Sequence, residues 1–249
     1  MMALTATATT SARQKISRTL CLRRCYSITT NPQKDNIFYA VEVKTDVKES
    51  FTPLVEELTM KNIGTPRTVI FCRTYNDCHS VYLFFKHSLK EKIYFPQGAL
   101  RDSKHRLVDM YTACTAKSVK KNIVENFTAA NGTCRVVIAT IAFGMGLDSP
   151  DVRTTIHWGP SASIESYVQE SGRVGRDGNR ALAKLLYAPR DLSSKFISND
   201  VKAYCRNPEN LCRRELLFKQ FDYYSAFDGL LHDCCDVCAP KCLCSTCKH

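Results

Sequence analysis

The sequence lacks any long hydrophobic run. Its longest apolar candidate, Val136–Leu147, is short and is interrupted by Gly144 and Gly146. A helix needs about 20 consecutive apolar residues to cross the hydrocarbon core of a bilayer. We therefore expect no membrane-spanning helix in this sequence.

Two phosphate-handling motifs are also missing. The sequence has no GxxxxGK[ST] loop, whose backbone amides would cradle phosphates, and no DExH-type box, which would hold Mg²⁺. The chain by itself is therefore expected to hydrolyse little or no nucleoside triphosphate.

Acidic residues are absent from the first 34 positions, which hold six basic residues and many serines and threonines. This composition superficially resembles a mitochondrial transit peptide. The string ALTATATTSARQKI supports another interpretation, a strand-end loop followed by a helix from Ser11 to Leu20. The two interpretations predict different fates for this segment, since a transit peptide would be removed.

Basic residues are in excess along the rest of the chain as well. The 249 residues include 35 lysines and arginines against 24 acidic residues, a net charge of +11, and 44% are hydrophobic, enough for a packed core. A positive excess spread along the chain favours a polyanionic partner, because each neutralised phosphate releases counterions. A soluble basic protein without such a partner is the alternative.

The segment from residue 135 to residue 178 organises the chain. Two short β-branched runs, Arg135–Thr140 and Arg153–Trp158, each end in a loop rich in Gly, Ser, Asp or Pro. Alternation of such runs with helical segments is typical of a parallel sheet covered by helices, with working loops at the strand ends. We expect an α/β fold.

A helix beginning at Ser163 leads into the string GRVGRDG. Gln169, Arg173 and Arg176 are spaced i, i+4 and i+7, so a continuous helix would place them on one face. Two guanidinium groups held side by side suit the charge that spreads over a transferring phosphoryl group. This face is the best catalytic candidate in the sequence.

Four strings carry a resemblance to a known family. ATIAFGMGLDSPDVR and SIESYVQESGRVGRDG resemble motifs V and VI of superfamily 2 helicases, specifically of the RecQ family of DNA helicases. ALTATATTSARQKI resembles motif III, and TVIFCRT resembles motif IV. The resemblance covers nearly the whole chain and favours the helicase interpretation of residues 1–30 over a transit peptide.

The resemblance implies both a fold and an activity. The fold would be a RecA-like parallel sheet with helices on both faces, followed by a small helical zinc-binding module. Residues 1–30 would be a remnant of the first RecA-like lobe, 31–192 the second lobe, and 193–249 the zinc module. The activity would be ATP-dependent 3′-to-5′ unwinding of DNA in repair, recombination or replication, which implies a nuclear protein.

The family's phosphate loop and DExH box lie upstream of motif III. ATP and Mg²⁺ would therefore be shared with an N-terminal helicase lobe that this chain does not contain, and the chain alone is expected to be inactive. A non-catalytic nucleic-acid-binding module is the alternative function.

The resemblance also assigns roles at the nucleotide. Gln169 and Arg173 would lie near it, and Arg176 would be the arginine finger that reaches the γ-phosphate. Asp148 would face the ribose, and Gly146 would belong to the same cofactor-binding loop.

The residues implied in DNA contact follow the first of the two β-branched runs. They are Thr140, Phe143 and Met145. Their partner would be single-stranded DNA or its junction with a duplex.

Cysteines crowd the carboxyl-terminal part of the chain. Eight of the fourteen fall within the last 45 residues, at positions 205, 212, 234, 235, 238, 242, 244 and 247. No secretory signal argues for an oxidising compartment, so clustered thiols predict a metal site before disulfides.

Several ligand sets fit the cysteine spacing. The CRR string at Cys212 and the later CCDVC string resemble the RecQ zinc module, and our preferred Zn²⁺ ligands are Cys212, Cys234, Cys235 and Cys238. His232 is the alternative to Cys234. A third arrangement joins the CxxC pair at 235 and 238 to the pair at 244 and 247, and leaves Cys212 out.

Overall fold

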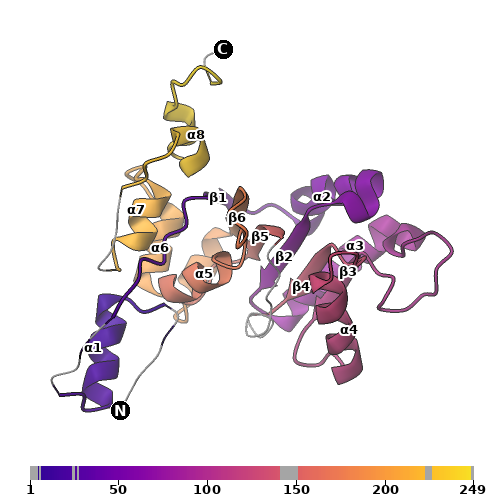
Figure 1. Ribbon diagram of the computed structural model, residues 1–249, viewed down its shortest axis with the longest axis horizontal. Coiled ribbons are helices and arrows are strands. Elements are labelled where there is room, and N and C mark those ends of the chain that lie inside the picture. Colours follow the sequence, from indigo (N-terminus) through magenta and orange to yellow (C-terminus); the bar gives the residue numbers. More distant parts are fainter. Residues whose placement is uncertain are drawn as a thin grey trace.

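The chain folds around one six-stranded parallel sheet (Figure 1). The computed structural model describes residues 5, 7–23, 26, 28–140, 151–221 and 226–247. The strand order is β1-β6-β5-β2-β4-β3, and every neighbouring pair is parallel. The strands are β1 (Ile37–Val43), β2 (Arg67–Cys72), β3 (Val108–Tyr111), β4 (Val136–Ala139), β5 (Val152–Trp158) and β6 (Ala181–Tyr187).

Helices cover both faces of the sheet, as the sequence predicts. In β2, Val69 and Phe71 enter one buried cluster while Ile70 and Cys72 enter the other, because successive side chains of a strand point to opposite faces. The first face packs against α4 (Lys117–Thr128), α5 (Ile164–Ser171), α6 (Asn199–Arg206) and α7 (Arg213–Phe218). The second packs against α2 (Val47–Lys61) and α3 (Tyr75–Leu89).

Local sequence signals set where these helices begin. The side chains of Asp46, Thr74, Ser163 and Ser198 each accept a hydrogen bond from a backbone N–H in the first turn of α2, α3, α5 and α6. Thr9 does the same for α1 (Thr10–Thr19). Such caps satisfy amide groups that have no partner inside the helix.

The edge strand β3 lies in a region, residues 92–112, where the sequence pattern is hard to interpret. Asp109 sits in the middle of this strand and is only 1% exposed. Its carboxylate accepts a hydrogen bond from Nη1 of Arg106 at 2.9 Å. Because one of its four residues is a buried acid, β3 lacks the hydrophobic pattern by which a strand is recognised in a sequence.

The carboxyl-terminal elements pack onto the lobe without a break in the hydrophobic core. Tyr204 of α6 and Leu217 of α7 belong to the same buried cluster as Tyr39 of β1. In Figure 1, α6 and α7 lie beside α5, and α8 (Leu231–Cys234) extends away from them. The short 3₁₀ helices are η1 (Asn62–Gly64), η2 (Lys90–Ile93), η4 (Pro189–Ser193) and η5 (Ala239–Lys241). The division into segments at residues 30 and 192 stays a prediction.

The amino-terminal helix α1 attaches to the same face. Thr9 Oγ1 donates to Oε1 of Glu165 at 2.7 Å, and the backbone N–H of Thr10 donates to the carbonyl of Gln220 at 3.3 Å. No residue of α1 is buried. Among the described residues no helix is long and apolar enough to span a bilayer.

Candidate nucleotide edge and metal centre

The arginine-bearing loop follows α5 and is not part of it. The prediction that Gln169, Arg173 and Arg176 share one helix face is wrong, because α5 ends at Ser171 and Gly172 caps it. Gln169 lies exposed on the last turn, and both arginines lie in the turns that follow. The glycine at 172 and the left-handed backbone of Gly175, with φ of +58°, break the helical path.

Hydrogen bonds from the sheet fix this loop in place. The backbone N–H of Gly175 donates to the carbonyl of Val152 at 3.0 Å. Nδ2 of Asn36 donates to the carbonyls of Gly175 and Asn179, each at 2.7 Å. Val152 begins β5 and Asn36 directly precedes β1, so the loop lies at the amino edge of the sheet.

The predicted DNA-contacting position lies at the other edge. Thr140 follows β4 directly and is partly buried. Because all six strands are parallel, their carboxyl ends share one edge, so Thr140 lies on the side of the sheet away from the arginine loop. The expectation that all working loops lie at the strand ends therefore fails for the arginines.

Positive charge accumulates at the arginine loop. Burial, followed by the neighbouring charge of Arg176, lowers the pKa of Arg173, and the same two causes lower the pKa of Lys34. Nζ of Lys34 donates to the carbonyl of Gly172 at 2.7 Å. Arg173 Nε is buried and has no hydrogen-bond partner within the described part of the chain. An anion bound at this edge would relieve the repulsion among the three cations.

An ion pair with β5 holds the end of the loop that follows Arg176. Asp177 receives two hydrogen bonds from the guanidinium of Arg153, and these lower the pKa of Asp177. The Asp177 carboxylate is therefore paired with an arginine of β5, and this pairing stabilises the loop.

Four of the predicted residues fall in the segment 141–150, which lies outside the described residues. They are Phe143, Met145, Gly146 and Asp148. Their roles at DNA and at the nucleotide stay predictions.

A buried polar group anchors α5 to β5. Glu170 Oε2 lies 2.9 Å from Nε2 of His157 and accepts a hydrogen bond from Oγ of Ser161 at 2.7 Å. The sequence suggests only a structural role for a lone histidine and gives no signal for its partners, because Glu170 and His157 are brought together by the turn between strand and helix. The pair holds the helix that carries Gln169 and leads into the arginine loop.

A cavity of about 180 Å³ opens next to this group at the carboxyl edge. The ends of β2 and β5 line it, with Arg73, Gly159, Ser161 and Phe196 among its residues. Sequence analysis missed this cavity, although Arg73 belongs to the TVIFCRT string. Arg73 thus places one basic side chain at the carboxyl edge, where Thr140 also lies.

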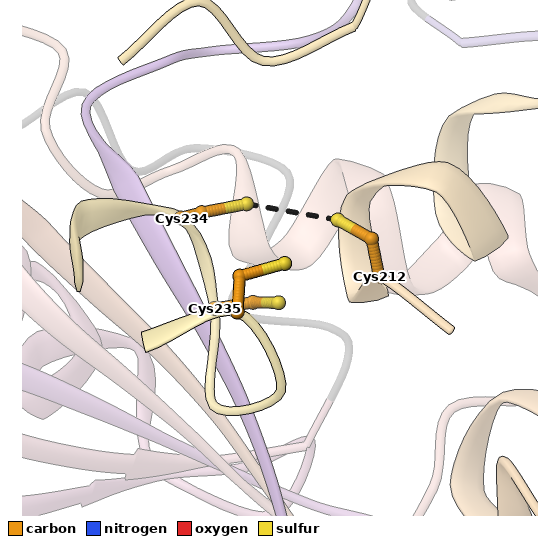
Figure 2. A group of neighbouring side chains, drawn as sticks. Cys212, Cys234 and Cys235 are labelled. Carbon is orange, nitrogen blue, oxygen red and sulfur yellow. Dashed lines mark hydrogen bonds between the residues drawn. The ribbon is translucent and has the colours of Figure 1, made fainter. Parts of the chain in front are cut away.

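The structure brings together the preferred metal ligands Cys212, Cys234, Cys235 and Cys238. Their Sγ atoms all lie within 4.8 Å of one another. Figure 2 shows Cys212, at the start of α7, facing Cys234 and Cys235. The sulfurs of Cys212 and Cys234 are 3.6 Å apart. His232 is not in this group, and neither is the CxxC pair at 244 and 247.

The four thiols fit a tetrahedral zinc ion. With Zn–S bonds of about 2.3 Å, two sulfurs of a tetrahedral site are separated by about 3.8 Å, close to the observed separation of Cys212 and Cys234. Every cysteine in the described ranges is a free thiol. Cys205 stands apart, because burial raises the pKa of its thiol to about 12 and it joins no ligand group.

The group of four cysteines is fastened to the edge strand β1. Asp236 receives hydrogen bonds from Nε of Arg213 at 3.0 Å and from the backbone N–H of Val41 at 3.0 Å. The fully buried Arg214 donates to three backbone carbonyls that lead into β1, those of Lys34, Asp35 and Ile37. These hydrogen bonds join the cysteine group to β1 and to the residues that lead into it.

Comparison with protein families gives a match over residues 49–178 to the helicase conserved C-terminal domain. The chain belongs to this family, in its RecQ branch. It is 32% identical over 257 residues to the ATP-dependent helicase wrn-1 of Caenorhabditis elegans, and 31% identical over 249 residues to the ATP-dependent DNA helicase Q1 of Mus musculus. Each alignment covers 96% of this chain but only 22% and 35%, respectively, of those relatives.

Solved structures show the same fold. S. cerevisiae Dbp5 bound to RNA and ADP BeF3 matches with a TM-score of 0.56 at 16% identity, over 82% of this chain and 47% of Dbp5. The Mss116p DEAD-box helicase domain 2 bound to an RNA duplex matches with a TM-score of 0.50 at 12% identity, over 75% of this chain and 70% of that domain. The RecA-like architecture predicted from the RecQ motifs is confirmed.

Proposed function

We propose that this chain supplies the second half of the active site of a RecQ-like, ATP-dependent 3′-to-5′ DNA helicase. The observation that carries the proposal is the convergence of Lys34, Arg173 and Arg176 at the amino edge of the sheet. The relatives, which are named ATP-dependent helicases, support the same activity. We place the protein's work in DNA repair, recombination or replication in the nucleus.

Arg176 would act on the γ-phosphate. It is exposed, as a residue reaching across an interlobe cleft must be. The hydrogen bonds from Asn36 and the Arg153–Asp177 pair hold the loop before nucleotide arrives, so little reorganisation accompanies the reaction. Arg173 and Gln169 would contact the nucleotide nearby, and Gly146 and Asp148 would complete the cofactor-binding residues.

ATP and Mg²⁺ would be bound mainly by an N-terminal helicase lobe with a phosphate loop. The bound Mg²⁺ and the loop lysine neutralise charge on the phosphates in such sites. The present residues would contribute guanidinium charge to the oxygens of the transferring group, which is where negative charge must be stabilised.

DNA would bind at the carboxyl edge. Thr140 would contact it there, and Arg73 supplies a cation on this edge. Phe143 and Met145 would be further DNA contacts.

The cysteine group would hold Zn²⁺ through Cys212, Cys234, Cys235 and Cys238. A closed set of four thiolates supplies structural cross-linking and no open position for chemistry. Its role here would be to fasten α7 and α8 to β1.

The test compares the chain alone with a two-lobe protein, made by placing the phosphate-loop lobe of a relative before it. We expect the chain alone to show little ATPase activity with or without single-stranded DNA, and the two-lobe protein to hydrolyse ATP and unwind a DNA junction. Arg176→Ala should lower kcat of the two-lobe protein by about 10³–10⁵.

Arg190→Ala is the matched control, because Arg190 is an exposed arginine on η4 that follows β6 at the opposite edge. At saturating single-stranded DNA, where a lost DNA contact changes only the DNA concentration required, it should leave kcat within about twofold of the parent. Strong turnover by the chain alone that Arg176→Ala abolishes would refute the need for a second lobe. Equal kcat values for Arg176→Ala and Arg190→Ala would refute the role of Arg176 as an arginine finger.

A non-catalytic nucleic-acid-binding module is the second candidate, and the net charge of +11 favours it. That function predicts DNA binding that weakens steeply with salt and does not depend on nucleotide. Recovery of unwinding in the two-lobe protein would exclude it.

A further inference from the structure

A second group of metal-binding side chains lies beyond the first. Nδ1 of His232 lies 3.4 Å from Sγ of Cys242, 3.3 Å from Sγ of Cys244 and 3.3 Å from Sγ of Cys247. All four donor atoms lie within 4.8 Å of one another. One imidazole nitrogen carries a single lone pair or a single proton, so it cannot make three equivalent hydrogen bonds. The four atoms form a shell around a common point.

The dimensions of this shell are those of a zinc site. With Zn–N of about 2.05 Å and Zn–S of about 2.3 Å, tetrahedral geometry separates nitrogen from sulfur by about 3.6 Å. The three observed separations are shorter by only a few tenths of an ångström. We propose that His232, Cys242, Cys244 and Cys247 bind a second Zn²⁺, so that the carboxyl-terminal module holds two.

The surroundings of His232 fit a ligand role. Its Nε2 lies 3.4 Å from Oδ2 of Asp233, and Oδ1 of the same carboxylate lies 2.9 Å from Nη2 of Arg180. A carboxylate at the remote nitrogen keeps the proton on Nε2 and leaves the Nδ1 lone pair for the metal. Arg180 also donates to the carbonyl of His232 at 3.3 Å and so fixes the backbone of the ligand.

The two groups share structural elements but no ligand. The short helix α8 carries His232 for one site and Cys234 for the other, and η5 separates Cys238 from Cys242. Each site is complete with four donors, so neither needs a ligand from the other. The third arrangement suggested by the spacing, with Cys235 and Cys238 joined to Cys244 and Cys247, is not the one that the structure brings together.

A metal also explains how the last segment is held. Between residues 239 and 247 only Cys242 is buried, and Leu243 is 77% exposed. So little apolar burial cannot order such a segment, whereas a metal cross-link between His232 and three thiolates can.

The experiment counts zinc in the full-length chain, purified under reducing conditions without added metal, by elemental analysis. We expect two zinc ions per chain in the parent and in Cys114→Ser, a control at an exposed cysteine on the loop after β3. Cys244→Ser and Cys247→Ser should each hold one. Cys212→Ser should also hold one, and the double variant Cys212→Ser/Cys247→Ser should hold none.

Replacement of zinc by Co²⁺ distinguishes the two sites in the same proteins. The parent should show ligand-field bands from both a four-sulfur and a three-sulfur, one-nitrogen set, and Cys247→Ser should keep only the four-sulfur spectrum. This signature also shows that the variant is folded. Neither measurement needs nucleotide or DNA, so the result is independent of the proposed helicase function.

Three outcomes would overturn the second site. One is a parent with a single zinc whose content does not change in Cys244→Ser and Cys247→Ser. The second is a parent with two zinc ions in which those substitutions remove neither. The third is a single zinc together with a disulfide among Cys242, Cys244 and Cys247, found by mass spectrometry of the unreduced chain.

Discussion

Nε2 of His157 lies 2.9 Å from Oε2 of Glu170, and these side chains are 2% and 7% exposed. We expect Glu170→Ala to lower the free energy of unfolding by about 3 kcal/mol, because it leaves His157 and Ser161 buried without their partner. Urea unfolding followed by circular dichroism measures this. Glu170→Gln is the control, since an amide keeps the shape and a hydrogen bond, and it should lose less than half as much. Equal losses would show that the carboxylate charge is required and that the shape and the remaining hydrogen bond contribute nothing.

Arg214 is the buried link between the group of four cysteines and β1. It is 0% exposed and donates to the carbonyls of Lys34, Asp35 and Ile37. Arg214→Met keeps most of the volume but leaves three carbonyls without their donor, so we expect a loss of about 3 kcal/mol or more. Arg206→Ala, at an exposed arginine on α6, should change stability by less than about 0.5 kcal/mol. Thermal and urea unfolding measure the stability of both variants. A loss for Arg214→Met as small as that for Arg206→Ala would contradict the role of Arg214 as a structural link.

Asp109 gives the protein a definite pH dependence. Burial raises the pKa of Asp109 to about 6, against the smaller opposing effect of Arg106. The folded protein therefore binds this proton more tightly than the unfolded chain, whose Asp pKa is about 3.9. The contribution to stability is present below about pH 4 and is lost as the pH rises through 6.

Asp109→Asn removes this titration. The stability of the parent relative to the variant should fall by about 3 kcal/mol at most between pH 4 and pH 7. Asp102→Asn is a control of opposite sign, because a hydrogen bond with His105 lowers the pKa of that exposed carboxyl. Denaturant unfolding at a series of pH values measures both. A flat difference for Asp109→Asn would show that the carboxyl titrates normally in the fold.

Gly175 and Gly178 offer a matched pair in the arginine loop. Both have positive φ, but a Cβ at Gly175 would lie 2.4 Å from Nδ2 of Asn36, whereas a Cβ at Gly178 meets nothing within 4 Å. Gly178→Ala should therefore cost about 1 kcal/mol from backbone strain alone. Gly175→Ala should cost clearly more, because it also displaces Asn36. Equal costs in urea unfolding would mean that the loop adapts without the Asn36 contacts.

The sequence by itself determined the fold class, several of the helices and the family. Short β-branched runs, capping residues and the motif strings are local features, and local interactions decide them. The expectation of metal in preference to disulfides also rests on a local feature, the clustered thiols, and it stays a prediction. The edge strand β3 escaped because its central residue, Asp109, is a buried acid whose partner Arg106 makes it tolerable there.

Only the tertiary structure decided which distant residues meet. Because α5 ends at Ser171, Arg173 and Arg176 lie at the amino edge of the sheet, whereas Thr140 lies at the carboxyl edge. In the structure, where α8 packs against β1, the clustered cysteines form two groups of four donors. His232 belongs to the second group and not to the first. Ligand spacing along a chain allows several groupings, and only the path of the backbone between the ligands selects one.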